Sequence, residues 1–192
     1  MDNTENKELF FSTFRKNVQR PGAEKLLAWM ETTDFFTAPA STRFHAAYEG
    51  GLLDHSMNVY NVLISKHFDP ASDDIESFTI VSLLHDLCKA GFYKTELRNR
   101  KNDRGEWEKV PVYTVDDQFP YGHGEKSVYL IERFMRLRTE EAMAIRWHMG
   151  GFDESVKGGS FALAHAFEKY PLAVKLHLSD LEATYLHENR SE

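Results

Sequence analysis

One segment of this chain places ionisable side chains directly after its most hydrophobic stretch. Residues 78–84 read FTIVSLL, and His85, Asp86 and Lys89 follow within the next five positions. A helix that is apolar on nearly every side is expected to lie in the protein interior. Burying an ionised carboxylate without a partner costs on the order of several kcal/mol or more. We therefore expect the fold to bring a positive charge to Asp86.

The length and composition fit one globular domain, residues 1–192. Of the 192 residues, 42% are hydrophobic and 28% are charged, and no shift in composition marks a second domain. A net charge of −7 argues against a broad surface for long duplex nucleic acid, because such surfaces are basic. The only cysteine, Cys88, argues against a disulfide framework and a cysteine-based zinc site. An acidic, polar start and no membrane-length apolar run predict a cytoplasmic protein.

Apolar periodicity and turn signals predict an all-α domain with one inserted β-hairpin. The hairpin is expected within residues 92–118, where Asn102-Asp103-Arg104-Gly105 is a turn signal between β-prone flanks. Two N-terminal helices are expected within residues 1–35, and the core of the domain over residues 40–188. The pattern predicts helices over residues 5–19, 22–31, 124–138, 139–149 and 171–188, another from Leu52, and the buried one between Asp74 and Gly91.

Inward-facing polar side chains come from five separate segments of this predicted domain. His55 lies opposite the polar stripe of its helix, and Asp180 shares the apolar face of the last helix. His123 precedes one helix and His148 ends another, and as neighbours of glycines both could instead be loop residues. A divalent metal ion offsets a buried aspartate, and imidazole is its commonest nitrogen ligand. The predicted metal ligands are His55, His85, Asp86, His123, His148 and Asp180.

The order H…HD…D resembles that of the HD-domain superfamily, helical metal-dependent phosphohydrolases. The string HAAYEGGLLDHS at residues 45–56 is similar to the segment that bears the first ligand in HD-type 3′–5′ exoribonucleases. LLHDLCK and LSDLEA stand where the family has its HD string and its later aspartate. The likeness covers roughly residues 40–188 and implies an HD-domain helical bundle. Its motifs are specific for the superfamily and do not name a substrate.

The resemblance implies that His55, His85, Asp86 and Asp180 hold one divalent ion. In the binuclear members of the family the HD aspartate bridges two ions, and the two later histidines bind the second. The alternative is a single ion, with those two histidines contacting a substrate phosphate. The ligand types suit Mn, Fe, Zn, Ni or Mg.

The implied activity is hydrolysis of a phosphomonoester or phosphodiester by a metal-activated water, with Asp86 and Lys89 as catalytic residues. The expected substrate is a small anionic phosphorylated molecule, a nucleotide or a short oligonucleotide. Lys89 could steady a phosphate oxygen or be a solvated lysine at a helix end. The hairpin carries more cations than anions, so we expect Arg98 and Lys101 to help bind the substrate. The alternative is that the hairpin is an ordinary solvated one. The rings available for stacking on a base are Tyr93, Trp107 and Tyr113.

Two other functions stay open. The same ligand order resembles that of the di-iron HD-type oxygenases, and His and carboxylate ligands suit iron as well. A metal in a non-catalytic regulatory module is the third reading, although structural sites are usually closed. Among the remaining histidines, we expect His45 to support a ligand from outside the site. His177, one turn before Asp180, is the rival ligand on the last helix.

Overall fold

The computed structural model describes residues 2–188 and is built mainly of helices, with one antiparallel hairpin. The strands are β1 (Tyr93–Lys101) and β2 (Trp107–Val115). Short 3₁₀ turns cover Leu87–Lys89 and Gly150–Phe152, and a π-helical turn covers Ala183–His187. The α-helices are α1 (Asn3–Asn17), α2 (Ala23–Met30), α3 (Gly51–His67), α4 (Ile75–Leu84), α5 (His123–Glu132), α6 (Thr139–Trp147), α7 (Glu154–Lys157), α8 (Ala162–Lys169) and α9 (Pro171–Glu182). The predicted helical fold with an inserted hairpin is therefore confirmed.

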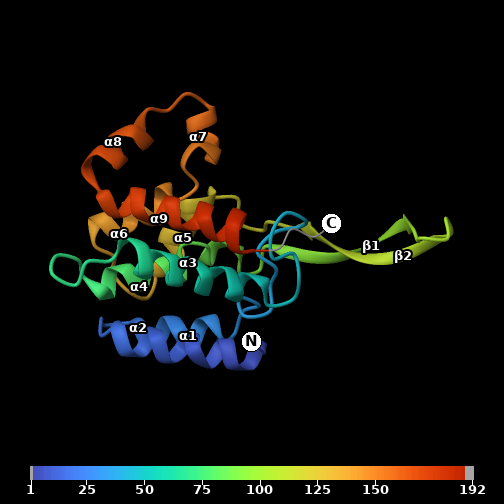
Figure 1. Ribbon diagram of the computed structural model, residues 1–192, viewed down its shortest axis with the longest axis horizontal. Coiled ribbons are helices and arrows are strands. Elements are labelled where there is room, and N and C mark those ends of the chain that lie inside the picture. Colours follow the sequence, from blue (N-terminus) through green and yellow to red (C-terminus); the bar gives the residue numbers. More distant parts are fainter. Residues whose placement is uncertain (1, 189–192) are drawn as a thin grey trace.

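Helix α4 lies at the centre of the helical body, as its sequence predicts. Its residues from Ser77 to Leu84 are all buried, and α1, α3, α6 and α9 pack around it. Figure 1 shows α1 and α2 as a layer on one side of α3 and α4, with α9 on the other side. Asp74 caps the N-terminus of the helix, because its side chain accepts a hydrogen bond from the Glu76 amide at 3.0 Å.

A buried ion-pair network fixes the turn between α1 and α2 onto this centre. Arg20 in that turn donates to Glu141 of α6 at 2.6 Å and to Glu76 of α4 at 2.9 Å. The Glu141 side chain is fully buried, and it also accepts hydrogen bonds from the Ser77 hydroxyl and the Arg138 amide. One arginine therefore ties the N-termini of α4 and α6 together.

The hairpin projects away from the helical body (Figure 1). The strands pair in register from Tyr93 opposite Val115 to Lys101 opposite Trp107, and most of their side chains are exposed. At the base of the hairpin, the Tyr93 hydroxyl donates to the carbonyl oxygen of Ala40 at 3.1 Å. The hairpin is therefore attached to the body mainly at its open end.

Several predicted boundaries are wrong. Helix α4 ends at Leu84 rather than near Gly91, because Asp86 leaves the helical conformation with φ −101° and ψ 20°. The helix predicted over residues 124–138 ends at Glu132. The last helix ends at Glu182 and continues as the π-helical turn, while α7 and α8 were not predicted. Across residues 2–188, no helix has both the length and the apolar character needed to cross a membrane.

Candidate metal centre

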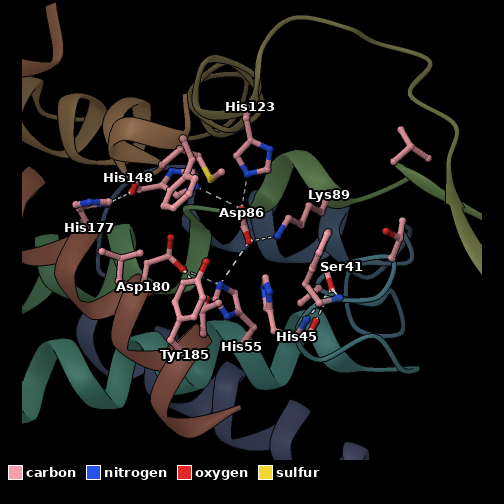
Figure 2. Close-up of a pocket in the computed structure, with 18 of the residues that line it drawn as sticks. Ser41, His45, His55, Asp86, Lys89, His123, His148, His177, Asp180 and Tyr185 are labelled. Atoms are coloured by element: carbon pink, nitrogen blue, oxygen red, sulfur yellow. Dashed lines mark hydrogen bonds and ion pairs between the residues drawn. The ribbon is translucent and has the colours of Figure 1, made fainter. Parts of the chain in front are cut away.

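Six side chains from five parts of the fold point toward one another around Asp86. His85 and Asp86 directly follow α4, at the centre of the body. Figure 2 shows His55, His123, His148 and Asp180 arranged around Asp86. They come from α3, from the first turn of α5, from the residue after α6, and from α9. The structure thus brings together all six side chains that the sequence predicts as ligands.

Most of this cluster is closed to solvent. The His55, His85, Asp86 and His148 side chains are at most 2% exposed. Asp180 and His123 are more open, with 15% and 27% of their side chains exposed. Buried polar atoms need partners, so a group of imidazoles and carboxylates this dry requires an explanation.

The buried histidine rings are held by their Nδ1 atoms. The Nδ1–H of His85 donates to the backbone carbonyl oxygen three residues earlier at 2.8 Å, and that of His148 does the same at 2.7 Å. The Nδ1–H of His55 donates to the carboxylate of Glu188 at 2.9 Å. Such contacts fix the tautomer and orientation of metal-binding histidines. In the neutral rings, the Nε2 atoms therefore carry free lone pairs.

These Nε2 atoms face each other and the carboxylates. The Nε2 atoms of His55 and His85 are 3.1 Å apart, and His55 Nε2 lies 3.3 Å from Asp180 Oδ1. Two ligands bound to one ion at about 2.1 Å are separated by about 3.0–3.4 Å, so both distances fit a shared ion. His148 Nε2 is buried without a hydrogen-bond partner among residues 2–188. These buried groups can hold a metal ion.

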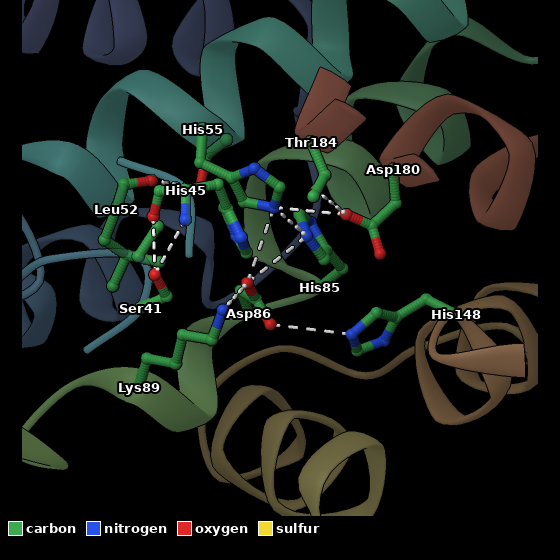
Figure 3. A network of polar contacts seen from close by, with 12 residues as sticks. Ser41, His45, Leu52, His55, His85, Asp86, Lys89, His148, Asp180 and Thr184 are labelled. Carbon is green, nitrogen blue, oxygen red and sulfur yellow. Dashed lines mark hydrogen bonds and ion pairs between the residues drawn. The ribbon is translucent and has the colours of Figure 1, made fainter. Parts of the chain in front are cut away.

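The two carboxylate oxygens of Asp86 face two different groups of histidines. Asp86 Oδ2 lies 3.5 Å from His55 Nε2 and 3.6 Å from His85 Nε2. Asp86 Oδ1 lies 2.8 Å from His123 Nε2 and 3.5 Å from His148 Nε2. Figure 3 shows His55 and His148 on different sides of the same carboxylate. Asp86 thus stands between two possible ligand groups.

Lys89 is a buried partner of Asp86 and not a solvated lysine at a helix end. Only 8% of the residue is exposed, and its Nζ is 2.6 Å from Asp86 Oδ2. Burial opposes the charge of Lys89, but the nearby carboxylate of Asp86 raises the pKa of its ammonium group. Burial likewise opposes the charge of Asp86, but Lys89 and the histidines hold the pKa of its carboxyl group well below the usual range. Lys89 is thus part of the positive partner that the sequence demands.

The carboxylates favour positive charge at His55 and burial disfavours it at His85. Burial opposes the charged form of His55, yet hydrogen bonds to Asp180 and Glu188 raise its pKa to about 10. Burial lowers the pKa of His85 to about 3. A proton on His55 can therefore occupy the space between the two rings, and a metal ion must displace it to bind.

Sequence reasoning missed two neighbours of the cluster. The side chain of Glu188 is 3% exposed and holds His55, while its Oε2 is buried without a partner among the described residues. The buried Cys88 has its Sγ 3.5 Å from His123 Nδ1. Glycine allows this crowding, because a Cβ on Gly124 would overlap the backbone of α6. Nothing in the spacing of Glu188 distinguishes it from a solvated glutamate.

Two further histidines lie beside the cluster. The Nδ1–H of His177 donates to the backbone carbonyl oxygen of His148 at 2.6 Å, so His177 braces a predicted ligand. The ring of His45 lies 5.1 Å from that of His55 and lines the same cavity. Asp180, and not His177, is the ligand candidate on the last helix, because Asp180 contacts His55.

A cavity of about 770 Å³ opens over the cluster. Its lining includes Lys89, His45 and the predicted ligands other than His85. Among the described residues, the hairpin contributes only Tyr93 and Val115 to the lining. Arg98 and Lys101, expected to bind substrate, lie exposed on β1 and do not reach the cavity. Trp107 and Tyr113, expected to stack on a base, are absent from the same described lining.

Comparisons with known proteins do not identify this chain. Searches of protein-family models, of curated proteins and of solved structures gave no significant match. The geometry and chemistry of the cluster around Asp86 must therefore support any functional proposal.

Proposed function

We propose that this protein is a metal-dependent phosphohydrolase of the HD superfamily. The observation that carries the proposal is the 3.1 Å approach of the His55 and His85 Nε2 atoms beside the carboxylates of Asp86 and Asp180. A divalent cation satisfies all four groups at once, and the chain order of these residues resembles that of the superfamily. His55, His85, Asp86 and Asp180 would hold the first ion.

The two-sided environment of Asp86 supports a second ion. Asp86 Oδ1, His123 and His148 form the other group, and the Nε2 of His148 is buried without a hydrogen-bond partner in the described chain. When bound, such ions activate a water and offset the negative charge of a phosphoryl group in the transition state. We favour two ions over one for this reason.

The remaining charged groups have roles that follow from their positions. Lys89 lines the cavity and holds Asp86, so its ammonium group can orient that carboxylate and attract a phosphate oxygen. Glu188 keeps the ring of His55 oriented from behind. The size of the cavity suits a nucleotide or another small phosphate ester. Arg98 and Lys101 lie on the exposed hairpin outside the cavity, so their positions do not support contacts with the substrate.

The test is ester hydrolysis by metal-free protein reloaded separately with Mn, Fe, Zn, Ni and Mg. Phosphomonoesters are assayed by the phosphate released and phosphodiesters by the phosphomonoester and alcohol formed, and oxygen uptake is recorded on the iron-loaded sample. Hydrolysis of either ester class that depends on metal supports the proposal. Oxygen uptake without ester hydrolysis would favour the oxygenase, and metal-dependent folding without turnover would favour a regulatory module.

Variants separate the roles of the ligands. We expect Asp86→Ala to lose both ions together with activity, because its carboxylate belongs to both groups. His148→Ala is expected to lose one ion and keep the other. His165→Ala is the matched control, since His165 is an exposed histidine on α8. Metal content is measured by mass spectrometry. Equal metal content in all three variants would contradict the assignment.

A further inference from the structure

We propose that the mouth of the cavity is a binding site for a planar aromatic group, of the nucleobase type, on the phosphate ester. This inference rests on the proposed phosphohydrolase function, because it assumes that the phosphate lies at the metal cluster. It assigns the recognition of the ring to Phe44 and Phe152, which no part of the metal-site proposal uses.

Exposed aromatic rings stand around the opening. Phe44, Phe152 and Tyr185 all line the cavity, yet they are 60%, 52% and 51% exposed. Large apolar side chains gathered at a concave opening indicate a ligand surface more than a packing surface. The three come from different parts of the chain: the loop before α3, the turn after His148, and the π-helical turn after α9.

The two phenylalanines follow or adjoin histidines that lie on different sides of Asp86. Phe44 adjoins His45, and Phe152 follows four residues after His148. Figure 2 shows His45 and His148 on different sides of Asp86, with Tyr185 beside Asp180 and His55. A planar group attached to a phosphate at Asp86 would therefore extend between the two loops that carry Phe44 and Phe152.

The loop that carries Phe44 is built to hold a fixed shape. Ala46 is buried with φ +43°, a left-handed conformation that residues other than glycine rarely adopt. The Ala46 carbonyl oxygen accepts a hydrogen bond from the Ala40 amide at 3.0 Å, which closes the loop. The Ser41 hydroxyl accepts from the Phe44 amide at 2.9 Å. Any Cβ on Gly51 would overlap the backbone of Ala46, so the start of α3 supports the loop closely.

A cation fixes one face of the Phe44 ring. The guanidinium carbon of Arg43 lies 5.0 Å from the ring centroid, over the ring. This contact leaves the opposite face available for stacking. Lys157 of α7 adds an exposed ammonium group to the lining of the cavity. A flat, electron-rich heterocycle near a charged phosphate fits this combination of rings and cations.

The test compares AMP with ribose 5-phosphate, which carries the same sugar and phosphate without a base. Metal-loaded protein is titrated by calorimetry with the phosphonate analogue of each probe, in which a CH2 group replaces the ester oxygen, so that no hydrolysis interferes. We expect AMP to bind about 100-fold more tightly, because two base–aromatic contacts of about tenfold each act together. Phe44→Ala and Phe152→Ala should each weaken AMP binding about tenfold and change ribose 5-phosphate binding less than twofold. Phe44→Trp should keep the preference.

Phe161→Ala is the matched control, because Phe161 is 80% exposed and is not among the described residues that line the cavity. Equal affinity for the two probes, or unchanged AMP affinity in both cavity variants, would overturn the inference. A changed oligomeric state with unchanged AMP affinity would also overturn it, in favour of a protein interface. The hydrolase proposal is tested separately by phosphate release from both probes on metal-loaded protein. Phosphate release without tighter binding of AMP would refute only the proposed ring site. Tighter binding of AMP without phosphate release would refute only the proposed hydrolase function.

Discussion

Replacing Arg20 with alanine should destabilise the protein strongly, although Arg20 is not part of the candidate metal centre. The Arg20 side chain is 13% exposed and pairs with Glu141, which is 0% exposed. Breaking a buried pair by removing one partner costs about 3–5 kcal/mol, because the other charge is left buried. Glu141 keeps its bonds from Ser77 and the Arg138 amide, so we expect the lower limit, about 3 kcal/mol.

Urea unfolding followed by circular dichroism measures this loss. For a chain of this size, about 3 kcal/mol corresponds to a drop in melting temperature of about 6–12 °C. The control is Arg15→Ala, because Arg15 and its partner Glu24 are 53% and 67% exposed and such pairs contribute about 0–1 kcal/mol. A loss for Arg20→Ala no larger than for the control would refute the reasoning.

The same variant has a predicted pH signature. Burial opposes the charge of Glu141, but hydrogen bonds from Arg20 and Ser77 hold its pKa below the ordinary 4.5. A lowered pKa in the folded state contributes stability above pH 4.5 that is lost as the pH falls toward the folded value. Wild-type protein should therefore lose stability below pH 4.5, and Arg20→Ala should lose less over that range because this contribution is already gone.

Three further variants test the site and its supports. Glu188→Gln should weaken metal binding about 10-fold or more in competition with a chelator, because Glu188 orients His55, while Glu182→Gln should not. Lys89→Ala should keep the metal content by mass spectrometry and lower kcat, because Lys89 contacts Asp86 and lines the cavity; lost metal would show that its role is misassigned. Gly51→Ala should lower the melting temperature, because the new Cβ overlaps the backbone carbonyl group of Ala46 in the neighbouring loop. An unchanged melting temperature would contradict the packing described.

The sequence predicts the part of the site that regular helices position. His55 lies opposite a polar stripe and Asp86 follows an apolar helix, so periodicity alone places both in the interior. The local sequence pattern does not determine how one element is oriented relative to the rest of the fold. The outward direction of the hairpin, which leaves Arg98 and Lys101 away from the cavity, depends on packing at its base around Tyr93.

Irregular backbone sets the other limit of prediction. Glu188 reaches His55 only because the chain after α9 leaves the α-helical path through a π-helical turn. The loop of Phe44 depends on the left-handed conformation of Ala46, which an alanine in a sequence gives no reason to expect. The predicted end of α4 near Gly91 is wrong for a related reason, because Asp86 leaves the helical conformation and contacts the histidines.

The most direct test is anomalous X-ray diffraction from crystals of the metal-loaded protein. The account predicts one ion coordinated by His55, His85, Asp86 and Asp180, and a second that shares Asp86 with His123 and His148. The contradicting result is a fully loaded crystal with no anomalous peak among these side chains and a hydrogen-bonded water between the His55 and His85 rings.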